Sequence, residues 1–195
     1  MRIIAGANRG TRLEAPKGGH TRPTADRARE TLFAVLDGGR IFREIGCPPV
    51  TGRRVLDAFA GTGAVGLEAL SRGAAHAVFI EDDGAALTAL ERNVAHCHRE
   101  KRATVLRRDV LNPPPAGAPC DLVFLDPPYG RDLPARALDA LAKAGWIAPD
   151  AVVVVQHHPK DRFDRPAGFA TIDTRTVGAA RFEILRPQPG NGTSG

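Results

Sequence analysis

The sequence is poor in cysteine and has no long apolar run. Its three cysteines, Cys47, Cys97 and Cys120, are widely spaced and odd in number, so a disulfide framework is not expected. No run approaches the roughly 20 apolar residues that cross a bilayer, and the opening MRIIAGANRG lacks the apolar core of a signal peptide. These absences predict a cytoplasmic protein without a membrane partner.

The stretch that most suggests a metal site is His96, Cys97 and His98. Adjacent residues on a helix point in different directions, so these three side chains cannot converge on one ion unaided. We therefore expect no bound metal.

The sequence has fewer acidic than basic residues, and most of the difference lies near the N-terminus. The net charge is +5, and residues 1–30 hold seven Lys and Arg against three Asp and Glu, which is +4 of that total. A basic arm ahead of a more nearly neutral body is typical of a nucleic-acid contact surface. A solvated, mobile terminus would carry the same charge, so charge alone does not decide between the two.

Strand and helix patterns alternate along most of the 195 residues. A basic hairpin (2–5 with 11–15), a helix (24–36) capped by Thr24, and a glycine- and proline-rich loop (38–52) come first. The expected strands are 53–59, 76–81, 103–110, 120–126, 151–156, 169–175 and 181–187. The expected helices are 63–73, 82–97 and 133–145.

This alternation predicts an α/β fold, a Rossmann-like, doubly wound and mostly parallel sheet of seven strands. We expect three parts in the chain. Residues 1–37 form a basic hairpin and helix extension, residues 38–187 form the main domain, and residues 188–195 form a disordered tail.

Acidic residues end four successive predicted strands: Asp57, Glu81, Asp109 and Asp126. Ligands of doubly wound sheets bind at the carboxyl ends of the strands. Any one of these acids alone is readily explained as a solvated surface residue. All four together predict a ligand site along one edge of the sheet.

The glycine loop GTGAVG, with Gly61, Gly63 and Gly66, fits a dinucleotide fingerprint only weakly. Asp57 precedes it, where its charge would repel a pyrophosphate. A cofactor that carries an ammonium or a sulfonium would be attracted instead, and S-adenosylmethionine carries both. Glu81 would then accept from the ribose hydroxyls, and Asp109 from the adenine amine.

The stretch DPPYG, residues 126–130, follows the fourth strand. The carboxylate of Asp126 and the carbonyl of Pro127 can accept the two N–H groups of an amine on a flat ring, which localises its lone pair toward a methyl donor. Pro128 helps to fix these acceptors in direction. Tyr129 can stack on the ring.

These stretches resemble class I S-adenosylmethionine-dependent methyltransferases, with VLDAFAGTGAVGLEALSRGA as the first motif and DPPYG as the fourth. More narrowly, the chain resembles the RsmD-type family, which methylates the exocyclic N2 of a guanine in small-subunit ribosomal RNA. The opening MRIIAGANRGTRLEAP and the block RPTADRARETLF carry this narrower resemblance.

The resemblance implies S-adenosylmethionine as cofactor and ribosomal RNA as partner, presented in a partly assembled small subunit to a monomeric enzyme. The implied cofactor residues are Asp57, Phe59, Gly61, Thr62, Gly63, Glu81, Asp82, Asp109 and Val110. Residues Asp126, Pro127, Pro128 and Tyr129 would hold a flipped-out guanine. The expected phosphate contacts are Arg9, Arg12, Lys17, Arg22 and Arg27.

One position departs from the family pattern. Many members have a glutamate after the fifth strand, where this chain has Gln156, His157 and His158. Gln156 is a candidate to take over the glutamate's role, and ordinary loop residues are the simpler interpretation of the two histidines.

Other functions stay open at this level. DPPY is shared with adenine-N6 and glutamine-N5 methyltransferases, although the latter usually have asparagine in place of Asp126. A nicotinamide-dependent oxidoreductase would use the same glycines. A non-catalytic RNA-binding module is also compatible with the fold, but it would have no need of an intact DPPY.

Overall fold

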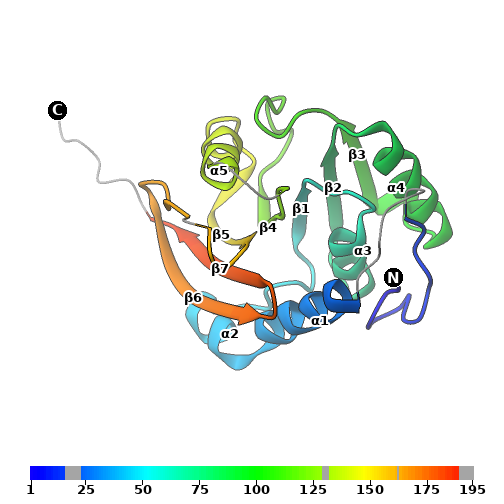
Figure 1. Cartoon of the computed structure of the whole chain (residues 1–195), viewed down its shortest axis with the longest axis horizontal. Coiled ribbons are helices and arrows are strands. Elements are labelled where there is room, and N and C mark those ends of the chain that lie inside the picture. The colour runs from blue at the N-terminus through cyan, green and yellow to red at the C-terminus, as the bar shows by residue number, and fades with distance from the viewer. Residues whose placement is uncertain (16–22, 129–131, 162, 189–195) are drawn as a thin grey trace.

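A seven-stranded mixed sheet organises the protein (Figure 1). The computed structural model describes residues 1–15, 23–128, 132–161 and 163–188, with the backbone alone for residues 23–25. The strands are β1 (Arg54–Ala58), β2 (His76–Glu81), β3 (Ala103–Arg107), β4 (Cys120–Leu125), β5 (Ile147–His157), β6 (Phe169–Val177) and β7 (Ala180–Pro187). Their order is β3-β2-β1-β4-β5-β7-β6.

The first five strands are parallel, while β7 runs antiparallel to both β5 and β6. The predicted seven-stranded, mostly parallel sheet is confirmed. The strand order reverses between β1 and β4, which lie side by side although β2 and β3 separate them in sequence. Such a switch point is where doubly wound sheets bind ligands.

Helices cover both faces of the sheet. They are α1 (Pro23–Asp37), α2 (Gly39–Ile45), α3 (Ala64–Ser71), α4 (Gly84–His96) and α5 (Leu133–Lys143), with a short 3-10 helix, Glu100–Arg102. Alternate residues of each strand point to opposite faces. Val55 of β1 accordingly packs in a core with α1 to α4, and its neighbour Leu56 in a second core with α5.

Helix α2 corrects the prediction of a loop over residues 38–52. Gly38 and Gly46 flank this helix, and Gly46 ends it in the left-handed conformation (φ 75°). Ile41 between them is 1% exposed and packs in the core. The glycines and prolines of this region therefore punctuate a short helix, and the buried face of that helix is too brief to give a clear periodic signal.

The predicted N-terminal hairpin is present in reduced form. It consists of one antiparallel bridge between Arg2 and Arg12, with hydrogen bonds from the Ile3 N–H to the Thr11 carbonyl and from the Gly10 N–H to the Ile3 carbonyl, both 2.9 Å. Helix α1 then begins at Pro23, so Thr24 lies inside its first turn instead of capping it. The division of the chain at residue 37 stays a prediction.

Buried polar side chains attach this arm (residues 1–15) to the sheet domain. Glu68 of α3 is fully buried and accepts hydrogen bonds from the N–H groups of Ile4 (2.7 Å) and Ala5 (3.0 Å). Asn93 of α4 accepts from the Glu14 N–H (2.7 Å) and donates to the Thr62 carbonyl (3.0 Å). The arm is therefore bonded to the helix after the glycine loop, and through Asn93 to the loop itself.

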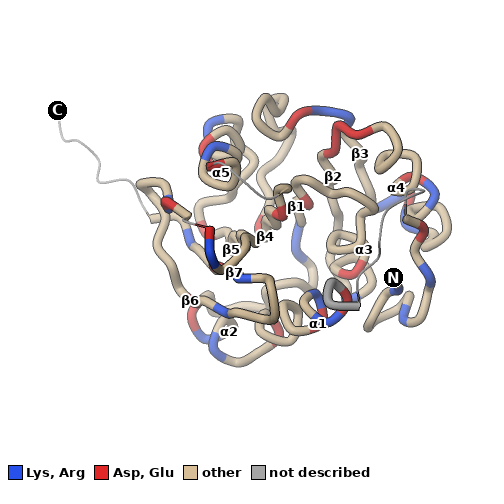
Figure 2. Tube along the Cα trace, in the orientation of Figure 1, with Lys and Arg blue, Asp and Glu red and all other residues tan. Residues whose placement is uncertain are grey.

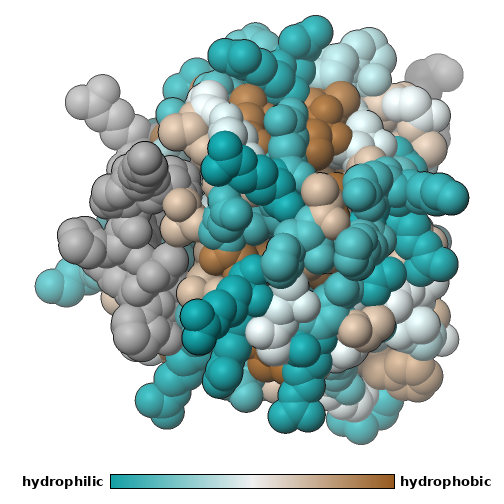
Figure 3. Space-filling model, turned by 90° about the vertical axis from the view of Figure 1, so that its right-hand side faces the viewer, coloured by the Kyte–Doolittle hydropathy of each residue, from teal (hydrophilic) through white to brown (hydrophobic). Residues whose placement is uncertain are grey.

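No helix within the described ranges is long and apolar enough to cross a membrane. Figure 3 views the side of the molecule that carries the arm and α4, where the surface is largely hydrophilic with small, separated apolar areas. Phe42, which is 46% exposed, is the only large hydrophobic side chain that is exposed in the described part of the chain.

Candidate active site

A pocket of about 230 Å³ lies at the carboxyl ends of β1 and β4. Four parts of the chain line it: the N-terminal Met1, helix α1, the glycine loop and the ends of three strands. Its lining includes Met1, Arg29, Leu32, Asp57, Phe59, Gly61, Thr62, Asp126 and Gln156. The sheet and the N-terminal extension thus build this pocket together.

The glycine loop has a backbone that suits close approach. Gly61 and Gly63 have positive φ angles of 55° and 76°, and Phe59 has one of 62°, which is uncommon for a residue with a side chain. A Cβ on Gly63 would lie 2.3 Å from Leu90, and one on Gly66 would lie 2.4 Å from Phe79. These two glycines are required by packing, whereas Gly61 faces open space.

Asp57 is a buried acid on the wall of the pocket. It is 3% exposed, and its carboxylate accepts a hydrogen bond from the Gly66 N–H (2.8 Å). Burial raises the pKa of Asp57 to about 8, although the Gly66 N–H acts in the opposite direction. The nearby carboxylates of Asp126 and Glu81 raise this pKa further. A cation bound beside Asp57 would reverse that shift and favour the ionised form.

Glu81 ends β2 and already organises the backbone around the pocket. One of its oxygens accepts from the Gly61 N–H (2.6 Å), and the other accepts from the N–H groups of Asp82 (3.0 Å) and Asp83 (2.9 Å). A carboxylate has about four lone-pair sites, so Glu81 can still accept from a ligand hydroxyl. The side chain of Asp82 is exposed beside it.

Asp109 lies two residues beyond β3, because this strand ends at Arg107 and not at Val110 as expected. Its carboxylate accepts from the Leu111 N–H (2.8 Å) and from the side chain of Asn112 (2.9 Å). Val110 is 3% exposed and packs in the core beneath. Neither residue lines the 230 Å³ pocket, but both lie on the same edge of the sheet as Glu81.

Asp126 follows β4 directly and lines the pocket. Its side chain is accessible to solvent, yet the surrounding protein atoms limit its hydration, and this desolvation raises the pKa of Asp126 to about 6. Pro127 is buried and Pro128 is exposed. Tyr129 lies outside the described residues, so its predicted stacking is not addressed by the structure.

Because the sheet order is β3-β2-β1-β4, the four acids occupy the ends of four adjacent strands. Figure 2 shows acidic segments along this edge, basic segments in the arm, and segments of both signs in α1. The arrangement can bind a cation beside Asp57 and hydrogen-bond donors beside Asp126. The ionised form of Asp57 in this pocket would repel a pyrophosphate bound at the glycine loop.

Comparisons with known proteins identify the family of this chain. The model of the family described as conserved hypothetical protein 95 matches residues 1–186. "Ribosomal RNA small subunit methyltransferase D" of Escherichia coli K12 is 38% identical over 187 residues, which cover 95% of this chain and 89% of that protein. The chain belongs to this family, the RsmD-type family of the sequence resemblance.

Two further relatives support the membership. The protein of the same name from Haemophilus influenzae is 31% identical over 190 residues, covering 95% of this chain and 93% of the relative. The solved structure titled "Putative methyltransferase yhhF from Escherichia coli" has a TM-score of 0.80 at 34% identity, covering 96% of this chain and 98% of that one. The fold is therefore the Rossmann-like fold of methyltransferases.

The structure shows where Gln156 and His157, the residues that depart from the family pattern, are located. Gln156 lines the pocket, whereas the next residue, His157, is 6% exposed and turned into the structure. The His157 ring lies 5.6 Å from that of Phe163, and its Nδ1 is 3.0 Å from the His158 carbonyl oxygen. His157 is the last residue of β5 and not a loop residue, so its burial assigns it a structural role.

The expected phosphate contacts are only partly described. Arg9, Arg12 and Arg27 are exposed, and their side chains form no hydrogen bond or ion pair with any described residue. Lys17 and Arg22 lie outside the described residues. Three exposed cations thus lie on the arm and α1, as an RNA contact requires.

Sequence reasoning missed Arg29, which is 5% exposed and lines the pocket. Its Nη2 donates to the Arg2 carbonyl (2.6 Å) and to Asp26 (3.0 Å). Arg29 was counted only as part of the basic arm. Its spacing of three and four residues from Leu32 and Phe33 could have indicated burial, because residues at this spacing share one face of a helix.

Proposed function

We propose that this protein transfers a methyl group from S-adenosylmethionine to the exocyclic N2 amine of a guanine in small-subunit ribosomal RNA. The observation that carries the proposal is that Asp57 and Asp126 share one pocket with the glycine loop at the switch point of the sheet. The printed names of the E. coli and H. influenzae relatives support the substrate class.

The residues present fit the cofactor. Asp57 is buried with a raised pKa, so it gains most from a ligand that brings positive charge. The Glu81 and Asp109 carboxylates follow on the same edge as acceptors for hydroxyl and amine groups. Phe59, Gly61, Thr62 and Gly63 would shape the loop around the cofactor, with Asp82 and Val110 at its far end.

When bound, S-adenosylmethionine supplies a methyl group already activated on sulfonium sulfur. Asp126 and the Pro127 carbonyl orient the guanine amine by accepting its two N–H groups, which aims the nitrogen lone pair at that methyl carbon. The pKa of Asp126, about 6, leaves it largely ionised at neutral pH. As the N–C bond forms and the S–C bond breaks, Asp126 can take the proton that the nitrogen loses.

The RNA backbone that flanks the reacting base must be bound outside the pocket. An amine inside a stacked helix cannot reach the strand ends, so the guanine has to be flipped out, with Tyr129 as its stacking partner. The basic extension (residues 1–37) would hold the flanking backbone through Arg9, Arg12, Lys17, Arg22 and Arg27. We expect the substrate to be a partly assembled small subunit and the enzyme to be a monomer.

Transfer from isotopically labelled S-adenosylmethionine tests the substrate class. Small ribosomal subunits, their naked RNA and their separated proteins are each incubated with the enzyme, and the label is followed into the RNA and protein fractions. We expect label in RNA, and more of it from the particle than from naked RNA. Label confined to protein would contradict the proposal.

A further inference from the structure

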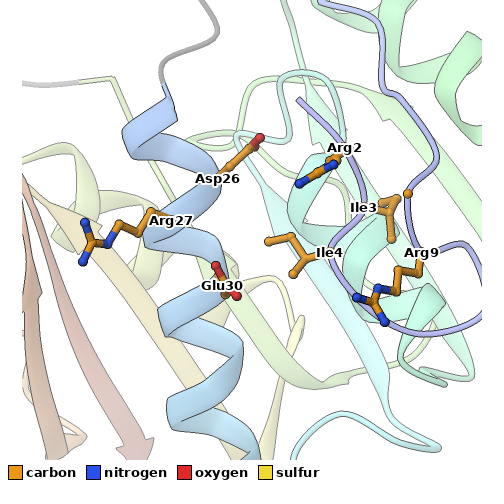
Figure 4. Close-up of a pocket in the computed structure, with 8 residues that line it drawn as sticks. Arg2, Ile3, Ile4, Arg9, Asp26, Arg27 and Glu30 are labelled. Atoms are coloured by element: carbon orange, nitrogen blue, oxygen red, sulfur yellow. The ribbon is translucent and has the colours of Figure 1, made fainter.

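A second cavity lies between the arm and α1 (Figure 4). Its volume is about 520 Å³. Arg2, Ile4 and Arg9 line it from the arm, and Asp26, Arg27 and Glu30 line it from the helix. The arm and α1 thus enclose the cavity together, and neither segment would form it alone.

The two walls of this cavity differ in charge, because the arm wall is basic and the helix wall carries both acidic and basic side chains. Arg2 and Arg9 extend from the arm, and Asp26 points from α1 toward the arm, while Arg27 lies on the opposite side of the helix (Figure 4). Ile4 places an apolar surface between them.

Most of these charges are not used within the protein. Across residues 1–15, 23–128, 132–161 and 163–188, the side chains of Arg2, Arg9 and Glu30 form no hydrogen bond or ion pair. Asp26 is engaged by Arg29, 3.0 Å away. The arm wall therefore offers two available cations, Arg2 and Arg9, and the helix wall offers one available carboxylate, Glu30, together with the guanidinium of Arg27.

This combination selects a ligand with three features. The ligand must carry an anion for the arginines, N–H donors for Glu30, and an apolar face for Ile4. Inorganic phosphate lacks the last two features and would be repelled by the acids. A nucleotide has all three, since its phosphate is an anion and a guanine, cytosine or adenine base presents N–H donors on a flat ring.

Arg29 joins this cavity to the candidate active site. It lines the 230 Å³ pocket, and its Nη2 donates to both the Arg2 carbonyl and the Asp26 carboxylate, residues of the second cavity. We propose that the second cavity binds another nucleotide of the RNA substrate, near the methylated guanine in the chain. Its phosphate contacts Arg2 and Arg9, and its base donates to Glu30. This inference rests on the proposed function.

Arg9→Ala and Glu30→Gln test the two halves of the contact. Arg43→Ala and Glu44→Gln are matched controls, because they make the same charge changes at exposed positions of α2, outside both cavities. Arg9→Ala should raise the Michaelis constant for RNA by about tenfold, the usual scale for losing one charge-assisted contact. Its affinity for S-adenosylmethionine should stay unchanged, and the controls should match the wild type in both measurements.

The effect of Glu30→Gln is measured as a change in the enzyme's preference for the base at each position near the methylated guanine. Ribosomal RNA substrates are prepared with each nucleotide near the methylated guanine changed in turn. The wild type should favour a base with an exocyclic amine, which is guanine, adenine or cytosine, over uracil, which has only a ring N–H, at one of these positions. Glu30→Gln should reduce that preference at least about fivefold. The preference should survive in Glu44→Gln.

The outcomes separate this inference from the proposed function. If the wild type methylates guanine N2 but Arg9→Ala and Glu30→Gln behave like the α2 controls, the second cavity does not bind RNA. Methyl transfer to guanine N2 then stands, and only the phosphate contact of Arg9 is removed from the proposed function. If the wild type methylates no RNA, the proposed function itself fails, and this inference fails with it.

Discussion

At the antiparallel end of the sheet, buried carboxylates form ion pairs with arginines, whereas at its parallel centre Asp57 forms no ion pair with a described residue and lies near two further carboxylates. Asp173 of β6 is 7% exposed, and its carboxylate is 3.3 Å from the guanidinium of Arg40. Glu183 of β7 is 8% exposed and 3.0 Å from Arg181. Asp57, although equally buried, shares its pocket with the carboxylate of Asp126.

The difference teaches that burial alone does not mark a functional acid. An acid paired with arginine contributes to the structure that contains it. The pKa of Asp57 is raised because burial outweighs the hydrogen bond that it accepts from the Gly66 N–H, and such a perturbed pKa is typical of functional sites. The comparison therefore assigns function to the parallel centre and structure to the antiparallel end, and substitutions can test this division.

The largest effect is expected from Asp126→Ala. It should lower the rate of methyl transfer at least about a hundredfold and change cofactor affinity little, because Asp126 acts mainly in the transition state. Single-turnover assays and calorimetry measure the two quantities. Asp173→Asn is the counterpart at the paired end, and it should lower thermal stability but not the rate per folded molecule. Full turnover by Asp126→Ala would remove Asp126 from the chemistry.

Asp57→Ala and Glu81→Ala come next. Each should weaken S-adenosylmethionine binding by about 1–3 kcal/mol, the scale for losing a charge-assisted hydrogen bond. Glu81→Gln is a useful companion, because it keeps the shape of the side chain and one acceptor oxygen, but it removes the charge and one of the two oxygens that accept backbone N–H groups. Calorimetry showing unchanged affinity in both alanine variants would place the cofactor elsewhere.

The third prediction concerns the pH dependence of stability. Since the pKa of Asp57 is raised to about 8 in the folded protein, the folded state binds more protons than the unfolded state between about pH 4 and pH 8. Stability without cofactor should therefore fall as pH rises through this window, by up to about 1.4 kcal/mol per pH unit from this group.

Thermal unfolding of wild type and Asp57→Asn from pH 5 to pH 8 measures this contribution. The variant should show a flatter profile, because it has no proton to lose at this position. Identical slopes for the two proteins would show that Asp57 is not held in its protonated form.

The smallest effect concerns Arg12, an exposed arm residue that lines neither cavity. Arg12→Glu should raise the Michaelis constant for RNA several-fold and flatten its salt dependence, since one phosphate contact is removed. Cofactor affinity should not change. An unchanged salt dependence of the Michaelis constant would mean that Arg12 does not contact an RNA phosphate.

The fold was predictable because its signals are local. The run of valines at 152–155 predicts a buried parallel strand, and Gly73 and Gly145 indicate the ends of helices. Helix α2 was not predicted because it is only seven residues long and lies among glycines and prolines. The end of β3 was misjudged because Asp109 and Val110 continue the sequence pattern after strand pairing has stopped.

The candidate site was predictable in its acids and glycines, whose strand-end positions follow from the pattern of elements. Arg29, Glu68 and Asn93 were missed as a group, because their roles arise from contacts with residues distant in sequence. Glu68 bonds to residues more than 60 positions away, and no local pattern reports such a partner. The roles assigned to the site residues stay predictions until they are measured.

Mass spectrometry of nucleosides from ribosomal RNA methylated by this protein tests the central claim most directly. RNA from small subunits is digested after reaction with the wild type and, as a control, with Asp126→Ala. The account predicts N2-methylguanosine with the wild type alone. N6-methyladenosine, or a methylated glutamine in ribosomal protein with unmodified RNA, would contradict it, because the pocket would then hold a different planar amine.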